Sequence, residues 1–77
     1  MMTYDQAKLF ECTRTGIGAS FGEIKRLTGW KTNRAAQALK ECVEAGYVGH
    51  HVVNGAMYFA HTETGEKAYE TWSNIPF

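Results

Sequence analysis

Residues 20–48 determine the architecture of this chain and read SFGEIKRLTGWKTNRAAQALKECVEAGYV. Residues 20–23, Ser-Phe-Gly-Glu, have the spacing of a capping box, in which side chains satisfy the unpaired amides of a helix start. Ile24 and Leu27 follow on one face of the predicted helix, which points them toward the core. Gly29 ends this short helix because glycine favours the left-handed exit conformation.

A longer helix is predicted over residues 33–45, after a tight turn in which Trp30 packs from the inside. Its apolar side chains recur at spacings of three and four residues, and they are Ala35, Ala38, Leu39, Cys42 and Val43. Lys31 stands where a small capping residue is common, so we expect Thr32 to cap the helix. Gly46 ends the helix.

A β-hairpin follows, because two β-prone runs, residues 47–53 and 56–61, flank the pair Asn54-Gly55. A two-residue type I′ turn requires positive φ at both central positions, which Asn-Gly supplies. The register of such a hairpin brings four apolar side chains to one face: Val48, Val52, Met57 and Phe59. We expect that face to be buried.

Helices are also predicted at both ends of the chain. Thr3 and Gln6 have capping-box spacing before a helix over residues 4–14, whose apolar side chains are Tyr4, Ala7, Leu9 and Phe10. A short helix over residues 65–72 presents Ala68, Tyr69 and Trp72 either to the first helix or to a second chain. Residues 73–77 read as a tail, so residues 1–77 are expected to be a single domain.

Composition excludes several classes of protein. A chain of 77 residues is too short for a multidomain enzyme, and it contains neither a recognisable nucleophile-and-base constellation nor a phosphate-binding glycine loop. We therefore expect no enzyme and no cofactor. Two cysteines are too few for a disulfide framework, and no apolar run or signal peptide points to a membrane, which indicates a cytoplasmic protein.

The histidines and cysteines are expected to be structural. The hairpin register brings His50 and His61 to one face, but two ligands do not make a zinc site and spacing supplies no third, so we expect no metal. His50 is interpreted as a half-buried strand residue. Cys12 and Cys42 lie on apolar helix faces and are expected in the core.

The order of elements and the local sequence resemble those of a known family. The similar segments are FGEIKRLTGW at residues 21–30, residues 33–39, EAGYV at 44–48 and TETGEK at 62–67. They resemble the MarR-like and PadR-like winged helix-turn-helix transcription regulators of bacteria and archaea. The resemblance implies an α+β fold with a three-helix core, a two-stranded hairpin wing and a short C-terminal helix.

The same resemblance implies that the helix over residues 33–45 lies in the DNA major groove and that the protein is a homodimer. Two features of the family are missing. The wing tip, residues 53–57, carries no charge, and the long flanking helices that form an effector pocket are not found in these 77 residues. No small-molecule effector is therefore expected.

Charge is distributed unevenly although the formal net charge is zero. Residues 20–40 hold five cations against Glu23 alone, a balance of +4, while residues 41–77 hold Lys67 against five glutamates, a balance of −4. Basic side chains on the predicted DNA-reading helices can replace phosphate counterions. The residues expected to contact phosphates are Lys25, Arg26, Lys31, Thr32 and Lys40.

Base readout is assigned to Asn33, Arg34 and Gln37, which the apolar pattern leaves on the outer face of their helix. Arginine can donate two hydrogen bonds to guanine, and asparagine or glutamine can pair with adenine. Apolar C-terminal residues predict the dimer interface, namely Tyr69, Trp72, Ile75 and Phe77. The sequence thus predicts a double-stranded DNA-binding transcriptional regulator or repressor of a prokaryote or phage.

A protein-interaction module that never meets DNA is the alternative. The near-neutral pI of about 6.8 and the uncharged wing favour this alternative.

Overall fold

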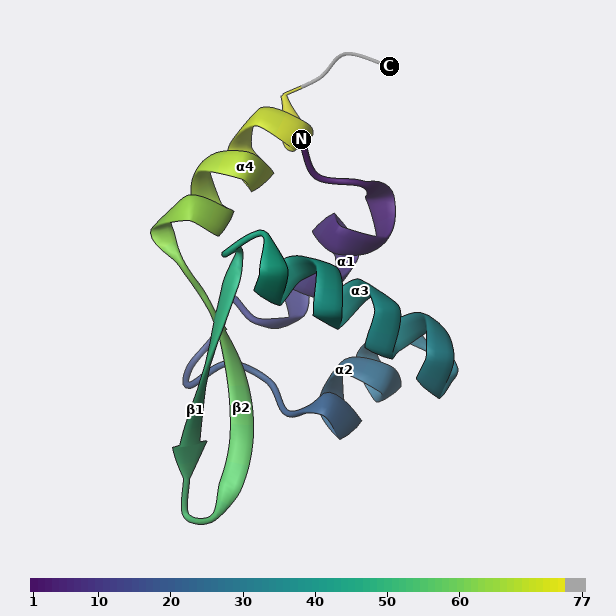
Figure 1. Ribbon diagram of the computed structural model, residues 1–77, viewed down its shortest axis with the longest axis vertical. Coiled ribbons are helices and arrows are strands. Elements are labelled where there is room, and N and C mark those ends of the chain that lie inside the picture. Colours follow the sequence, from purple (N-terminus) through teal and green to yellow (C-terminus); the bar gives the residue numbers. More distant parts are fainter. Residues whose placement is uncertain (75–77) are drawn as a thin grey trace.

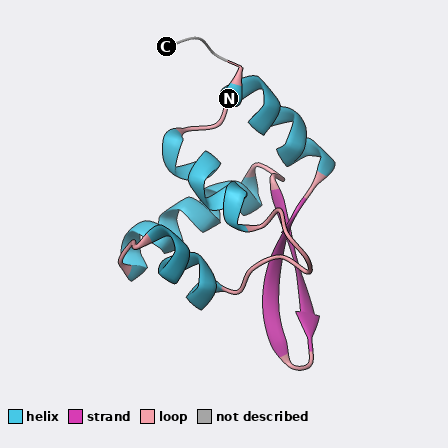
Figure 2. Cartoon of the chain, turned by 180° about the vertical axis from the view of Figure 1, so that it is seen from behind, coloured by secondary structure: helices cyan, strands magenta, loops and turns pink. Residues whose placement is uncertain are grey.

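The structure is a computed structural model that describes residues 1–74. These residues form an α+β fold of four helices and one two-stranded antiparallel sheet (Figure 1). The elements in chain order are α1 (Tyr4–Cys12), α2 (Phe21–Thr28), α3 (Thr32–Glu44), β1 (Val48–Val53), β2 (Ala56–His61) and α4 (Glu63–Ser73). The β1–β2 hairpin projects past the helices, at the end of the molecule opposite to α4 (Figures 1 and 2).

The first two helices begin where their capping boxes predict. The Thr3 hydroxyl accepts from the amide of Gln6 at 3.2 Å, and the Ser20 hydroxyl accepts from the amide of Glu23 at 3.2 Å. The prediction that α1 reaches residue 14 is wrong, because the chain turns at Thr13. The amide and the hydroxyl of this buried residue both donate hydrogen bonds to the carbonyl of Phe10, and the helix ends there.

The start of α3 differs from the prediction by one residue. Lys31 occupies the cap position, with an extended backbone (φ −75°, ψ 164°), and Thr32 is already helical. The prediction that Thr32 caps the helix is therefore wrong. Its hydroxyl instead lies 3.3 Å from Lys25 Nζ and accepts a hydrogen bond from it.

The hairpin has the predicted register, but only half of its predicted face is covered, by burial of Val48 and partial burial of Phe59 against the core. Val53 pairs with Ala56, and both turn residues have positive φ, as the type I′ turn requires. Val48 at the base is 3% exposed, whereas Val52 and Met57 are 63% and 49% exposed. The alternation of side chains along a strand predicts which residues share a face, but not whether that face is covered. The tip of this hairpin extends beyond the helices (Figure 1), so no helix within residues 1–74 covers it. His50, expected to be half-buried, is exposed for the same reason.

The core is centred on α1, with α2 and α3 packed around it. Leu9 and Phe10 of α1, Ile24 of α2 and Cys42 of α3 are fully buried, and Trp30 and Cys12 are partly buried against them. Three residues predicted to face the core are exposed instead: Tyr4 by 60%, Leu27 by 63% and Val43 by 39%. Three short helices have too little facing surface to cover every apolar side chain that they carry.

Helix α4 packs on α1, which is the first of the two alternatives that the sequence left open. A Cβ atom at Gly65 would lie 2.3 Å from the carbonyl oxygen of Tyr47 and 2.4 Å from Cε1 of Phe10, so only glycine allows this approach. The rings of Tyr69 and Phe10 then meet at a centroid distance of 5.5 Å. Within residues 1–74, no helix has the length and apolar character needed to cross a membrane.

Candidate nucleic-acid interface

The N-terminus of α3 differs from those of the other helices. Side chains of Thr3, Ser20 and Thr62 cap α1, α2 and α4, and each of these helices has an acidic residue in its first turn. In the described part of the chain, α3 has neither a side-chain cap nor an acidic first turn, and its first backbone bond runs from the Ala35 amide to the Lys31 carbonyl. The positive end of its dipole therefore faces no capping side chain and no carboxylate of its own first turn.

A basic hollow surrounds this helix end, in the turn between α2 and α3. The residues that line it are Lys25, Arg26, Trp30, Lys31, Thr32 and Asn33. Lys25 lies 5.4 Å above the ring of Phe21, and Arg26 has only a 3.9 Å contact with Glu23 while its side chain is 72% exposed. The fold therefore brings together four of the five residues predicted to contact phosphate.

The cations differ in whether a carboxylate neutralises them. Ion pairs of 4.0 Å or less engage five of the eight Lys and Arg residues: Lys8, Arg14, Arg26, Arg34 and Lys67. Within residues 1–74, the side chains without such a partner are Lys25, Lys31 and Lys40. All three lie on α2, on α3 or in the turn between them, so within residues 1–74 the Lys and Arg side chains without an ion pair are confined to this unit.

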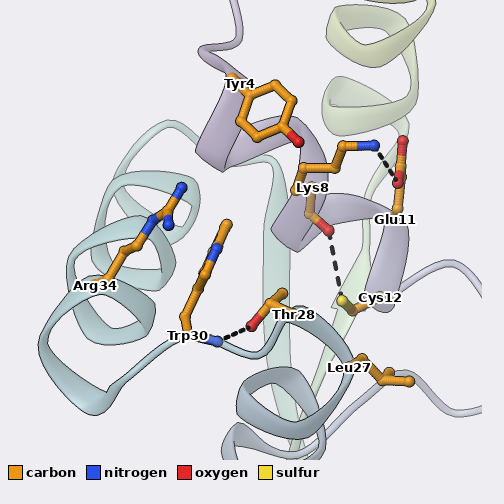
Figure 3. Close-up of a pocket in the computed structure, with 8 residues that line it drawn as sticks. All are labelled: Tyr4, Lys8, Glu11, Cys12, Leu27, Thr28, Trp30 and Arg34. Atoms are coloured by element: carbon orange, nitrogen blue, oxygen red, sulfur yellow. Dashed lines mark hydrogen bonds and ion pairs between the residues drawn. The ribbon is translucent and has the colours of Figure 1, made fainter.

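The three residues predicted to read bases do not form one group. Asn33 and Gln37 are exposed on α3, but Gln37 Nε2 donates to Glu41 Oε2 at 2.7 Å. Arg34 turns toward α1, where Nε and Nη2 donate to the two carboxylate oxygens of Asp5 at 3.0 and 2.8 Å. Its guanidinium also lies over the ring of Trp30, 4.6 Å from the centroid (Figure 3).

Two carboxylates that bind the predicted base-reading residues, Asp5 of α1 and Glu41 of α3, were not foreseen from the sequence. Hydrogen bonds from Arg34 lower the pKa of Asp5, and hydrogen bonds from Gln37 and Gln6 lower the pKa of Glu41. Both groups therefore stay ionised at neutral pH. Asp5 is 29 positions from Arg34, and no sequence pattern links the two, whereas the spacing of four between Gln37 and Glu41 on one helix could have predicted their contact.

A groove between α1 and the α2–α3 turn lies beside Arg34 and Trp30 (Figure 3). Its lining consists of Tyr4, Lys8, Glu11, Cys12, Leu27, Thr28, Trp30 and Arg34. Burial raises the pKa of the Cys12 thiol, and the charge of Glu11 raises it further. A protonated thiol is a poor nucleophile, so the groove offers polar and aromatic contacts rather than a reactive cysteine.

The predicted dimer residues are partly used within the chain. Tyr69 and Trp72 pack against the core of their own domain, and the Tyr69 hydroxyl donates to Glu11. Ile75 and Phe77 lie outside the described residues. In the described range, no three His, Cys, Asp or Glu side chains are placed to hold a metal ion.

Comparison with known proteins adds nothing to this geometry. No protein-family model matches the sequence, and neither a characterised protein nor a solved structure is significantly similar to it.

Proposed function

We propose that this chain is a winged helix-turn-helix protein that binds duplex DNA, with α3 in the major groove and β1–β2 as the wing. The observation that carries the proposal is the confinement of the unpaired cations to α2, α3 and their turn. Phosphates bind where cations are exposed and not already neutralised. The open N-terminus of α3 adds backbone amides to the same surface.

The outer face of α3 supports reading of bases as well as contact with phosphates. Asn33, Ala36 and Gln37 are exposed there, and the small side chain of Ala36 allows close approach of a base pair. Resemblance of the sequence to MarR-like and PadR-like proteins makes a small transcriptional regulator, acting as a repressor in a prokaryotic cytoplasm, the specific form of the proposal.

Binding as a homodimer through the C-terminal segment belongs to the same proposal. One recognition helix covers few base pairs, whereas two related by a twofold axis read half-sites about 34–36 Å apart. Sedimentation equilibrium of the whole chain, with and without duplex DNA, tests this. A monomer throughout the micromolar range in both samples would refute the dimer.

The second candidate is a protein-interaction module, which the exposed apolar hairpin favours. Val52 and Met57 form a cross-strand pair that is 63% and 49% exposed and has no charged neighbour at the tip. An apolar pair of this kind fits a protein surface better than a phosphate backbone.

A salt titration distinguishes the two functions. Fluorescence anisotropy against a random duplex, from 50 to 200 mM salt, should give an affinity that falls steeply with salt concentration. Lys67→Ala is a matched control for Lys31→Ala and Lys40→Ala, because Lys67 is paired with Glu63 on α4, away from α3. Absence of binding at 50 mM salt would refute DNA binding and leave the interaction module.

A further inference from the structure

The Arg34 side chain of α3 has an ion-pair partner and an aromatic neighbour, Asp5 and Trp30. Asp5 binds it in the plane of the guanidinium, through Nε and Nη2. The Trp30 ring lies beneath the guanidinium, with its centroid 4.6 Å from Arg34 Cζ. An arginine side chain otherwise rotates freely about several bonds, so these two contacts select one orientation of the group.

The geometry leaves a specific set of donors available. A guanidinium has five N–H donors, and the pair used by Asp5 is the side pair, formed by Nε and the neighbouring hydrogen of Nη2. The parallel pair at the end of the group, one hydrogen each from Nη1 and Nη2, forms no hydrogen bond within residues 1–74. The side chain is 52% exposed, so this end pair is open to a ligand.

A planar fork of two parallel N–H donors matches the O6 and N7 acceptors of guanine in the major groove. We propose that Asp5 is a positioning residue for DNA readout: it holds Arg34 so that the end pair of donors is presented to a guanine base. This inference rests on the proposed function, because it concerns how the same surface distinguishes sequences. Asp5 itself touches no base.

The chain contains a matched ion pair that serves as a control. Arg14 Nε and Nη2 each donate to Glu66 at 3.1 Å, and the Arg14 guanidinium lies 4.7 Å from the ring centre of Tyr69. This pair has the same bidentate geometry, the same aromatic support and similar exposure, but it joins the chain after α1 to α4. Glu66→Gln therefore removes an equivalent carboxylate away from α3.

The experiment uses duplexes selected from a random pool by the whole chain. Anisotropy titrations then compare the selected duplex with the same duplex in which the contacted guanine–cytosine pair is replaced by adenine–thymine, so that the N6 donor of adenine stands in place of the O6 acceptor of guanine. Loss of one good bidentate contact corresponds to about 1–3 kcal/mol, so the wild-type chain should bind the modified duplex roughly 5- to 150-fold more weakly.

Asp5→Asn should reduce this ratio to about threefold or less, while binding to random duplex is unchanged or tighter because a negative charge is lost. Arg34→Lys keeps the charge without the fork and should lose the same discrimination. Asp5→Asn combined with Arg34→Lys should lose no more than either alone. Glu66→Gln should keep the wild-type ratio, and circular dichroism checks that each variant is folded.

Each alternative outcome overturns a different statement. A wild-type ratio in Asp5→Asn overturns the positioning role and leaves DNA binding intact. A wild-type ratio in Arg34→Lys, or selected sites without guanine, overturns readout by Arg34. Equal loss in Glu66→Gln and Asp5→Asn means that discrimination depends on general stability. If the wild-type chain does not bind random duplex at 50 mM salt, the proposed function itself fails.

Discussion

Replacement of Gly65 by alanine tests the packing of α4 against α1. An alanine Cβ would lie 2.3 Å from the Tyr47 carbonyl oxygen and 2.4 Å from Cε1 of Phe10. One of these neighbours is backbone and the other belongs to a fully buried ring, so neither can move without disturbing the core. Overpacking of this kind costs about 1–3 kcal/mol, and the gain in helix propensity of about 0.5–1 kcal/mol offsets only part of it.

Gly22→Ala, at a similar position in another helix, should raise the free energy of unfolding rather than lower it. Both glycines lie in the first turn of a helix, but the nearest atom to a Cβ at Gly22 is the Ser20 hydroxyl at 4.0 Å. This variant should gain about 0.5–1 kcal/mol from propensity alone. Gly65→Ala should lose about 1 kcal/mol once the propensity gain is subtracted, which corresponds to a fall in Tm of about 4–8 °C for a domain of this size.

Urea denaturation followed by circular dichroism measures both free energies of unfolding. The two variants should shift the midpoint in opposite directions without changing the slope. Stabilisation by both substitutions would refute the close approach of α4, because it would mean that Gly65 has room for a methyl group. Equal destabilisation would instead refute the exposed position of Gly22.

Three further outcomes follow from the structure. Lys31→Ala and Lys40→Ala should each lower the salt slope of DNA binding by about 0.9, as measured by anisotropy, and an unchanged slope would remove the phosphate contact. Val48→Ala should cost about 2 kcal/mol in urea denaturation because the side chain is 3% exposed, whereas Val52→Ala at 63% exposure should change stability by about 0.5 kcal/mol or less. Burial raises the pKa of Cys42 to about 12, so a disulfide reagent at pH 8 should modify this thiol only as the protein unfolds, and faster reaction would contradict its burial.

Local sequence signals predicted most of the secondary structure. Two capping boxes and one Asn-Gly pair were sufficient to position α1, α2 and the hairpin, because each signal is satisfied by residues only a few positions apart. Burial of the hairpin could not be predicted in this way. Val52 and Met57 do share a face, but whether a face is covered depends on how far the strands extend past the helices.

The candidate site shows the same division between local and long-range information. The basic character of residues 20–40 could be read directly, and the fold gathers most of those side chains around one helix end. Neutralisation of Arg34 by Asp5 could not be read, because it depends on the packing of α1 against α3. The positions of the cations could therefore be predicted from the sequence, but not which of them form ion pairs with carboxylates.

In the proposed function, the number of unpaired cations limits how strongly one copy of the chain would bind DNA. Three phosphate contacts, from Lys25, Lys31 and Lys40, correspond to a salt slope of about −2.7 and a loss of about 40-fold in affinity between 50 and 200 mM salt. Two copies on one duplex double the slope to about −5.4 and raise the loss to roughly 2,000-fold, within the range of proteins that bind specific sites. Cations already paired with carboxylates add less, because they exchange one anion for another. The measured slope therefore counts the copies bound: a value near −5.4 requires two, and a value near −2.7 would mean that a single chain binds.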